Sequence, residues 1–174
     1  SGIATTTKQY VDLIAGTKAK VLDTRKTTPN FRVFEKWAVR IGGGHNHRFG
    51  LYDMIMLKDN HIDFCGGIKK AILAVKSYQE ENGLQLPVEV ETRSLRDIQE
   101  VIDTGFATRI MFDNFSVENT YKAVELVNGK FETESSGGIN LSTIKGYAET
   151  GVDFISVGAL THSSISLDLS LKAI

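Results

Sequence analysis

The stretch GLQLPVEVETRSLRDIQEVIDTGFATRIMFDN, residues 83–114, decides the fold because it contains one full period of a repeat. It begins with a glycine and a strand-like run, PVEVET. A helix-like segment follows, in which Leu95, Ile98 and Val101 recur at helical spacing. The segment ends at Gly105, since glycine readily takes the left-handed conformation after a helix, and a second strand-like run, TRIMFDN, comes next. The stretch therefore predicts a strand, a helix, a turn and a strand.

The same unit recurs along most of the chain. Glycines that end helix-like segments occur every 22 to 24 residues, at Gly83, Gly105, Gly129 and Gly151. Strand-like runs follow them, and two earlier runs, AKVLDTRK and DMIMLKDN, fit the same scheme and bring the strands to six. Alternation of strands and helices produces a parallel sheet. We therefore predict an α/β fold, a TIM-like parallel βα barrel that is incomplete at about six strands, with a doubly wound open sheet as the alternative.

Capping residues predict where several helices begin. Ser94, Ser116 and Asn140 precede helix-like segments and suit N-caps. Thr28 followed by Pro29 predicts a further helix start, because proline is favoured at the first helical position. That helix would carry an apolar face, which we expect to pack in the core, made of Phe31, Phe34, Trp37, Ala38 and Ile41.

Length and composition favour one globular domain. The chain has 174 residues, of which 41% are apolar, enough for a sizeable core. Its net charge of −1 gives no general attraction to nucleic acid, and no apolar run approaches the roughly 20 residues of a membrane span. Cys65 is the only cysteine, so an internal disulfide is excluded and a cytoplasmic location is expected. No signal peptide is visible.

The first residues, SGIATTTKQYVDLIAG, read like a helix entered midway, and they lack an initiating methionine. We expect residues 1–18 to be a helical segment left from an N-terminal part. Residues 19–174 are then expected to form a βα-barrel catalytic domain.

Charged residues stand at the predicted carboxyl ends of the strands, where the active site of a βα barrel lies. Arg25 and Lys26 end the first strand and Lys58 ends the second, so these cations could hold an anionic molecule. Glu91 and Asp113 end the next two strands and could bind Mg²⁺ or ribose hydroxyls. The last two strands run into SSGGIN and SVGALT, which offer N–H groups at a helix start to a phosphate. Together these ends predict an enzyme that binds a phosphosugar and an anionic partner.

Each strand end has a simpler explanation when it is taken alone. A carboxylate such as Glu91 can be solvated or can cap a helix. A pair such as Arg25 and Lys26 can lie on the surface, and SSGGIN can be a plain turn. The coincidence of six such ends favours a functional site over these explanations.

The stretch GGGHNHR, residues 42–48, allows two interpretations. In a strand, His45 and His47 would share a face and could bind Zn²⁺ together. However, no apolar strand precedes them, no cysteine is near, and His61 and His162 are the only other histidines. We therefore favour an anion site that includes His47 and Arg48 over a metal site.

The run DTRKTTPNFRVFEKWAVRIGGGHNHRFGLYDMIMLKDNHI, residues 23–62, resembles the quinolinate phosphoribosyltransferases, the decarboxylating nicotinate-nucleotide pyrophosphorylases. The matching motifs are Asp-Thr-Arg-Lys-Thr-x-Pro, Glu-Lys-x-Ala-Val, Gly-Gly-Gly-x-Asn-His-Arg and Lys-Asp-Asn-His. VEVET, MFDN, SSGGIN and ISVGALTHS are similar to later family motifs. The resemblance covers essentially the whole chain, and it corresponds to the barrel domain of the family.

The resemblance implies a reaction and a set of roles. These enzymes transfer the phosphoribosyl group of phosphoribosyl pyrophosphate to quinolinate in de novo NAD biosynthesis, and they release pyrophosphate and CO₂ and leave nicotinate mononucleotide. The residues expected around quinolinate are Arg25, Lys26, His47, Arg48 and Lys58. Those expected in catalysis are Lys26, Lys58, Glu91 and Asp113. The phosphate cradle is expected from Ser135, Ser136, Gly137, Gly138 and Gly158.

The resemblance also implies a cofactor and partners. Glu91 and Asp113 would hold Mg²⁺, directly or through the ribose. The family forms homodimers or larger homo-oligomers, in which a sandwich-like N-terminal domain of one subunit covers the other subunit's site and donates an arginine. We find no such domain in this sequence, and we count six strands where the family barrel has seven. The alternatives are a related barrel that acts on another anionic heterocycle, and an inactive binding or dimerisation module.

Overall fold

Six short parallel strands form one sheet in the computed structural model, which describes residues 2–165 and 168–173. The strands are β1 (Lys20–Leu22), β2 (Ile55–Leu57), β3 (Val88–Thr92), β4 (Arg109–Asp113), β5 (Glu132–Ser136) and β6 (Phe154–Ser156). Every pairing between neighbouring strands is parallel. The predicted α/β class and the six predicted strands are confirmed.

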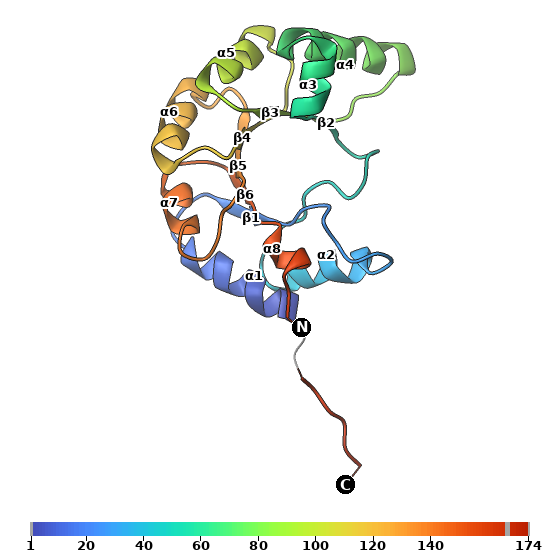
Figure 1. Cartoon of the computed structure of the whole chain (residues 1–174), viewed down its shortest axis with the longest axis vertical. Helices are drawn as coiled ribbons and strands as arrows, with labels where there is room; N and C mark the ends of the chain where they lie inside the picture. The colour runs from blue at the N-terminus through green and yellow to red at the C-terminus, as the bar shows by residue number, and fades with distance from the viewer. Residues whose placement is uncertain (1, 166–167, 174) are drawn as a thin grey trace.

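The strand order distinguishes the two predicted architectures. The order β1-β6-β5-β4-β3-β2 keeps sequence neighbours side by side around a ring, with a break between β1 and β2. A doubly wound sheet would instead change direction partway along the chain. The helices lie along the outer side of the curved sheet, and the ring is open where β1 and β2 face each other (Figure 1). This is the arrangement of a βα barrel that is left open between its first two strands.

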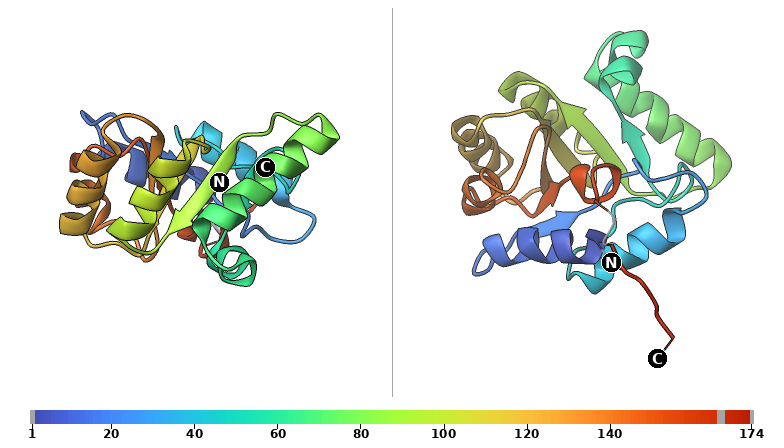
Figure 2. Two further views of the ribbon diagram at one scale, coloured as in Figure 1. Left: turned by 90° about the horizontal axis from the view of Figure 1, so that it is seen from above. Right: turned by 60° about the horizontal axis from the view of Figure 1, so that its bottom comes forward.

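The helices connect successive strands and begin with a segment before β1. They are α1 (Gly2–Leu13), α2 (Arg32–Ile41), α3 (Asp59–Cys65), α4 (Ile68–Asn82), α5 (Leu95–Thr104), α6 (Val117–Val127), α7 (Ile144–Glu149) and α8 (Ala159–His162). Helix α1 packs against α2 and α8, which brings the first helix next to the last (Figures 1 and 2). In the part of the chain that the structure describes, no helix is long and apolar enough to cross a membrane. The predicted domain boundary at residue 18 stays a prediction.

The segment after α2 runs beside β1 at the break in the ring. His45 forms a parallel bridge with Leu22, in which its N–H donates to the Val21 carbonyl at 2.8 Å. The His45 carbonyl in turn accepts from the N–H of Asp23 at 3.1 Å. His45 therefore occupies the position of a further strand next to β1, which a count of apolar runs could not reveal because the pairing is only one residue long.

Alternation along the strands separates an apolar outer face from a polar interior. Val88 and Val90 of β3 are buried at 3% and 0% exposure and pack in the apolar core between the sheet and the helices. Glu89, at 0% exposure, and Glu91 point to the other face, inside the ring. The barrel interior is thus lined by charged groups, and these need partners because water cannot reach them.

Helix α2 is turned the opposite way from our prediction. Phe34 and Trp37 of its apolar stripe are 54% and 61% exposed, so the prediction that this face packs in the core is wrong for all of the stripe but Ala38. The buried face carries Glu35 and Lys36 instead. Ion pairs and hydrogen bonds to the loops beside β1, described below, draw these two charged side chains inward.

The predicted caps are partly confirmed. Ser94 and Ser116 are the N-caps of α5 and α6, and their side chains accept from the N–H groups of Asp97 and Asn119 at 3.2 Å. The prediction that α2 begins at Thr28 is wrong.

Two local contacts explain where α2 and α7 begin. Thr28 donates its N–H and hydroxyl to Glu35, and Asn30 has a φ of 61° that no α-helix admits, so α2 starts at Arg32. Asn140 is not an N-cap either, because it accepts from Ser142 in a turn that precedes α7.

The caps give a test of the fold. Replacing Ser116 with alanine leaves an N–H of α6 without its acceptor, so the free energy of unfolding should fall by about 1 kcal/mol. The matched control is Ser77→Ala, which lies inside α4, where alanine is the better helix former and stability should hold or rise slightly. Urea unfolding measures both, and equal losses for the two variants would contradict the assigned cap.

Candidate active site

A cavity of about 840 Å³ opens at the carboxyl ends of the strands, inside the ring. Its volume lies in the range of small-molecule sites. Among the residues that line it are nearly all those predicted for the site, namely Arg25, Lys26, His47, Arg48, Lys58, Glu91, Asp113, Ser136, Gly137, Gly138 and Gly158. A smaller hollow of about 530 Å³ lies at the opposite strand ends and contains none of them. The structure therefore brings nearly all of the predicted residues together at one cavity.

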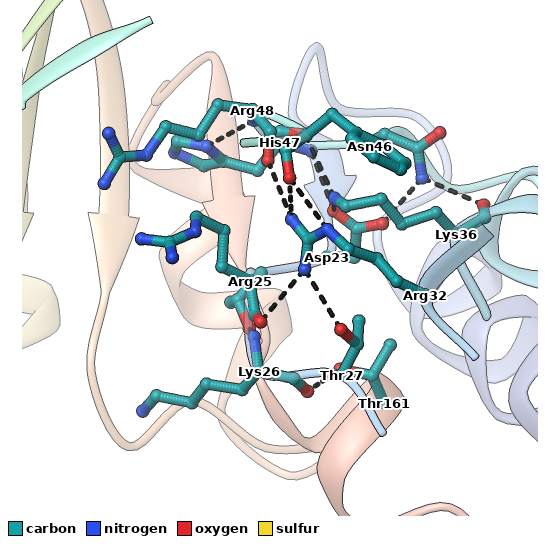
Figure 3. Close-up of polar contacts among 12 residues, drawn as sticks. Asp23, Arg25, Lys26, Thr27, Arg32, Lys36, Asn46, His47, Arg48 and Thr161 are labelled. Carbon is teal, nitrogen blue, oxygen red and sulfur yellow. Dashed lines mark hydrogen bonds and ion pairs between the residues drawn. The ribbon is translucent and has the colours of Figure 1, made fainter. Parts of the chain in front are cut away.

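The carboxylate of Asp23, at the end of β1, holds the site together (Figure 3). It is fully buried and accepts from Lys36 Nζ at 2.5 Å, from Asn46 Nδ2 at 2.6 Å and from the backbone N–H of His47 at 2.8 Å. Lys36 also donates to the His47 carbonyl at 3.1 Å. One buried ion pair thus joins β1, α2 and the segment that carries His47 and Arg48.

A second set of bonds fixes the loop that carries Arg25 and Lys26. Arg32 of α2 donates to the Arg25 carbonyl and to Thr27 Oγ1, both at 3.0 Å, and its Nε donates to the Phe49 carbonyl at 2.7 Å. Thr161 of α8 donates to the Lys26 carbonyl at 2.6 Å. Both cationic loops are therefore fastened through their backbones, which leaves their side chains available.

The cations at the rim of the cavity differ in their pairing. Within the described residues, the side chains of Arg25 and Lys26 form no ion pair with a carboxylate, and both residues are exposed. Lys58 Nζ lies 3.3 Å from Glu91 Oε2, and the Lys58 N–H donates to His61 Nδ1 at 3.0 Å. Unpaired cations at the mouth of a cavity attract anions, so this rim can receive a carboxylate or a phosphate.

The glycine turn after β5 forms the opposite wall. Gly137 has a φ of +95°, and a Cβ there would lie 2.3 Å from Asn114 Oδ1, so only glycine fits. Ser136 faces the cavity, but Ser135 does not line it, because neighbouring residues of a strand point to opposite faces.

Our prediction that SSGGIN opens a helix is wrong, since α7 begins only at Ile144. Gly158 immediately precedes α8.

A buried cluster of charges lies beneath the cavity. Arg109 Nη1 donates to Glu134 Oε2 at 2.9 Å, and His47 Nε2 lies 2.9 Å from Glu89 Oε2 and 3.5 Å from Glu134 Oε2. Glu89 and Glu134 are both fully buried. Burial raises the pKa of Glu89 to about 7 and, with the charge of Glu89 nearby, that of Glu134 to about 8. Burial lowers the pKa of His47, so its ring stays neutral.

The paired-histidine metal site is not formed. His45 is exposed and belongs to no metal-ligand cluster found among the described residues, whereas His47 is buried beside Glu89 and Glu134. One ligand atom from each of these last three residues lies within 4.8 Å of the other two, a spacing that a metal ion could bridge. Arg109 already supplies the positive charge at this place, so we assign no metal to the cluster.

Several cavity residues were missed by the sequence analysis. They are Thr24, Asn114, Glu134, Ser156 and His162. Glu134 carried a usable signal, because it stands two residues before Ser136 and so shares its face of the strand. His162 stands four residues after Gly158 in a one-turn helix, a spacing that brings its Nε2 to 2.9 Å from where a Cβ on Gly158 would lie.

The fold and the site together define a class of protein: a parallel βα barrel with an anion-binding cavity at its strand ends. The sequence model described as "Quinolinate phosphoribosyl transferase, C-terminal domain" matches residues 3–172. This chain belongs to that family.

Named relatives agree with this assignment. Quinolinate phosphoribosyltransferase [decarboxylating] 2b, mitochondrial, of Nicotiana tabacum is 50% identical over 186 aligned positions, which cover 99% of this chain and 52% of the relative. The probable nicotinate-nucleotide pyrophosphorylase [carboxylating] of Bacillus subtilis is 46% identical, over 98% of this chain and 58% of the relative. The chain thus spans about half the length of the curated relatives it matches.

Solved structures share the fold. NadC from Streptococcus pyogenes superposes with a TM-score of 0.92 at 47% identity, over 99% of this chain and 59% of that one. The nicotinate-nucleotide pyrophosphorylase from Francisella tularensis gives a TM-score of 0.91 at 46% identity, over 98% and 59%. These solved structures therefore share the fold of this chain.

The buried carboxyls predict how stability depends on pH. Their folded pKa values lie above the ordinary value of 4.5, so the folded protein keeps protons that the unfolded chain releases. This contribution is complete below 4.5 and is lost as the pH rises through about 7 and 8. Urea unfolding should show stability falling over this range, and less steeply in Glu134→Gln. Glu132→Gln, on the same strand but half-exposed, is the control, and an unchanged slope in Glu134→Gln would contradict the account.

Proposed function

We propose that the protein of which this chain forms the barrel catalyses phosphoribosyl transfer from phosphoribosyl pyrophosphate to quinolinate, with loss of CO₂, to give nicotinate mononucleotide. The observation that carries the proposal is the convergence of four cationic side chains, the carboxylates of Glu91 and Asp113, and a glycine turn on one cavity. Membership of the family supports the choice of substrates.

Quinolinate carries two carboxylates on neighbouring ring carbons, and the rim of the cavity supplies cations to match. Arg25 and Lys26 approach from the loop after β1, Arg48 from the segment beside it, and Lys58 from the end of β2. Guanidinium groups bind carboxylates with two parallel hydrogen bonds, which fixes the orientation of the ring. The cations thereby hold the ring nitrogen toward the sugar, and orientation of this kind is a large part of catalysis in such transfers.

The sugar donor belongs on the opposite wall. Glu91 and Asp113 stand on neighbouring strands, where their carboxylates suit the ribose hydroxyls, and Gly137, Gly138 and Gly158 leave room for a phosphate. The ring nitrogen bonds to the anomeric carbon as the bond to pyrophosphate breaks. Lys26 and Lys58 stabilise the negative charge that the leaving group gains.

The donor set fits Mg²⁺. This ion usually takes one or two protein carboxylates and completes its shell with water and substrate phosphates, and Glu91 and Asp113 are two carboxylates of that kind. When bound, Mg²⁺ would neutralise charge on the pyrophosphate as it leaves. Glu91 also faces Lys58, which keeps the carboxylate oriented when the ion is not bound.

The product of transfer carries a positive ring nitrogen next to the carbon that bears one carboxylate. The bond from that carbon to the carboxylate breaks, and CO₂ leaves. The electron pair of this bond stays on the ring carbon, beside the positive nitrogen, until the carbon takes up a proton from solvent. The protein therefore needs no electron sink of its own for this step.

We also propose a homodimer or larger homo-oligomer, in a cytoplasmic or similarly reducing compartment. The stripe of exposed apolar residues on α2 and the following loop supports the first point, and it comprises Phe31, Val33, Phe34, Trp37, Ile41, Leu51 and Tyr52. The exposed free thiol of Cys65 supports the second. Light scattering of the full-length protein would measure the mass, and a monomer would contradict the proposed assembly.

The reaction is tested with quinolinate that carries a radioactive label in the carboxyl group next to the ring nitrogen. Full-length protein with Mg²⁺ should release labelled CO₂ only when phosphoribosyl pyrophosphate is present. Nicotinate or another anionic heterocycle as acceptor tests the related-barrel alternative. A folded full-length protein that releases no label would rule out the proposed reaction.

The assignment of the two walls gives a second test. Glu91→Ala and Asp113→Ala should raise the KM for phosphoribosyl pyrophosphate about tenfold or more, the cost of one lost charged hydrogen bond, and change the KM for quinolinate less. Arg25→Ala serves as the matched variant and should show the opposite pattern. Steady-state kinetics with each substrate varied in turn measures both constants. A larger effect of Glu91→Ala on quinolinate would refute the assigned walls.

A further inference from the structure

The cluster beneath the cavity is built around a histidine whose two ring nitrogens both face the protein. His47 Nδ1 accepts a hydrogen bond from the backbone N–H of Arg48 at 2.6 Å. His47 Nε2 faces Glu89 Oε2 at 2.9 Å and Glu134 Oε2 at 3.5 Å. The role expected for His47, direct contact with a carboxylate of quinolinate, leaves neither contact explained.

These contacts determine where the ring carries its proton. A nitrogen that accepts a hydrogen bond has no proton of its own, so Nδ1 is unprotonated and the neutral ring carries its proton on Nε2. That proton points toward the two carboxyls, although the atoms lack the alignment of a complete hydrogen bond. An ionised carboxylate only accepts, so above about pH 8, where both Glu89 and Glu134 have lost their protons, the pair favours this tautomer over the alternative one.

The carboxyls themselves are held from below. Arg109 Nη1 donates to Glu134 at 2.9 Å, and its guanidinium lies 3.9 Å from the centre of the Phe154 ring. Neither buried oxygen of Glu89 has a complete hydrogen bond among the described residues, and His47 Nε2 lies 2.9 Å from one of them. A buried carboxylate without a partner is costly, which makes the position of the His47 ring strongly preferred.

The other side of the ring leads to the substrate. The N–H that His47 accepts belongs to Arg48, whose guanidinium lines the cavity and donates through Nη1 to the Met54 carbonyl at 3.1 Å. Rotation of the imidazole would free this N–H and loosen the backbone that carries Arg48. A chain of contacts therefore runs from Arg109 through the carboxyls and His47 to Arg48.

We propose that Glu89 and Glu134 are positioning residues that hold the His47 imidazole in its Nε2–H form, and that His47 in turn fixes Arg48 for binding a carboxylate of the acceptor substrate. The proposal deepens the function proposed above and rests on it only for the identity of the ligand. Neither carboxyl is given a contact with substrate in this role.

The test compares three variants of the full-length protein: Glu89→Gln, Glu134→Gln and Glu132→Gln. Glu132 is the matched control, because it lies on the same strand and binds the same Arg109 at 3.0 Å but does not face His47. A glutamine amide can donate to Nε2 at any pH, whereas the carboxyls of Glu89 and Glu134 cannot once they are ionised, so above about pH 8 either of the first two variants should populate the Nδ1–H tautomer. Nitrogen NMR of isotope-labelled histidine, with His47→Asn to assign the signal, reports the tautomer without any activity.

Quinolinate is the ligand used, and calorimetry and steady-state kinetics give its affinity and KM. Glu89→Gln and Glu134→Gln should weaken quinolinate about tenfold, as for one lost buried hydrogen bond, with the KM for the sugar donor unchanged. Glu132→Gln should behave as wild type in both the NMR and the binding measurements.

Three results would overturn the proposal: a wild-type His47 in the Nδ1–H or charged form, unchanged tautomer and affinity in both glutamine variants, or an equal loss in Glu132→Gln. Either of the two variants suffices if the other fails to fold, and the wild-type tautomer decides if neither folds. If wild type shows the Nε2–H form but binds no quinolinate, the proposed function fails while the arrangement of His47 stands.

Discussion

The buried ion pair between Asp23 and Lys36 is the interaction on which the site depends. Both side chains are almost fully shielded from water, at 0% and 3% exposure, so each must find its partner inside the protein. Burial lowers the pKa of Lys36, and the Asp23 carboxylate opposes this by stabilising the charged amine. Asp23 also accepts from Asn46 and His47, which satisfies the remaining acceptor positions. At the break between β1 and β2, this cluster and the bridge between His45 and Leu22 together hold the segment after α2 beside β1.

As a consequence, residues that are neighbours in the sequence have different roles. Asp23 and Lys36 are buried and bind each other, and Asn46 donates to Asp23, while Arg25, Lys26 and Arg48, only a few positions away, face the cavity. These motifs therefore contain two kinds of residue, those that line the cavity and those that hold the loops. The hydrogen bonds between Asp23, Lys36 and His47 serve this end, because a buried polar network whose groups are paired fixes side-chain positions.

Much of this arrangement could be predicted from the sequence. Glycine spacing and β-branched runs located all six strands, and the rule that barrel sites lie at carboxyl strand ends brought Arg25, Lys58, Glu91 and Asp113 together. These features are local or follow from topology. Ser135 was misplaced only because the one-residue alternation of β5 was not applied.

Other features depend on contacts between residues that are distant in sequence, and such contacts could not be predicted from the sequence. The apolar stripe of α2 predicted the wrong buried face, because the ion pair with Asp23 holds Lys36 on the inner side of the helix and leaves Trp37 exposed. The cluster of Glu89, Arg109 and Glu134 joins three strands and shows no periodicity along the chain. The proposed role of this cluster in holding His47 can be recognised only in the folded sheet, where the three strands lie side by side.

The most direct test of this account is the quinolinate affinity of the full-length Asp23→Asn variant, measured by calorimetry on protein whose circular dichroism shows a native fold. The substitution keeps the shape of the side chain but removes its charge. It also replaces one accepting oxygen with an NH₂ group, which can only donate and so cannot bind the donors of Lys36 or Asn46. The account predicts a loss of at least about tenfold in affinity, since the loop that carries His47 and Arg48 loses its main attachment. A folded variant that binds quinolinate as tightly as wild type would contradict it.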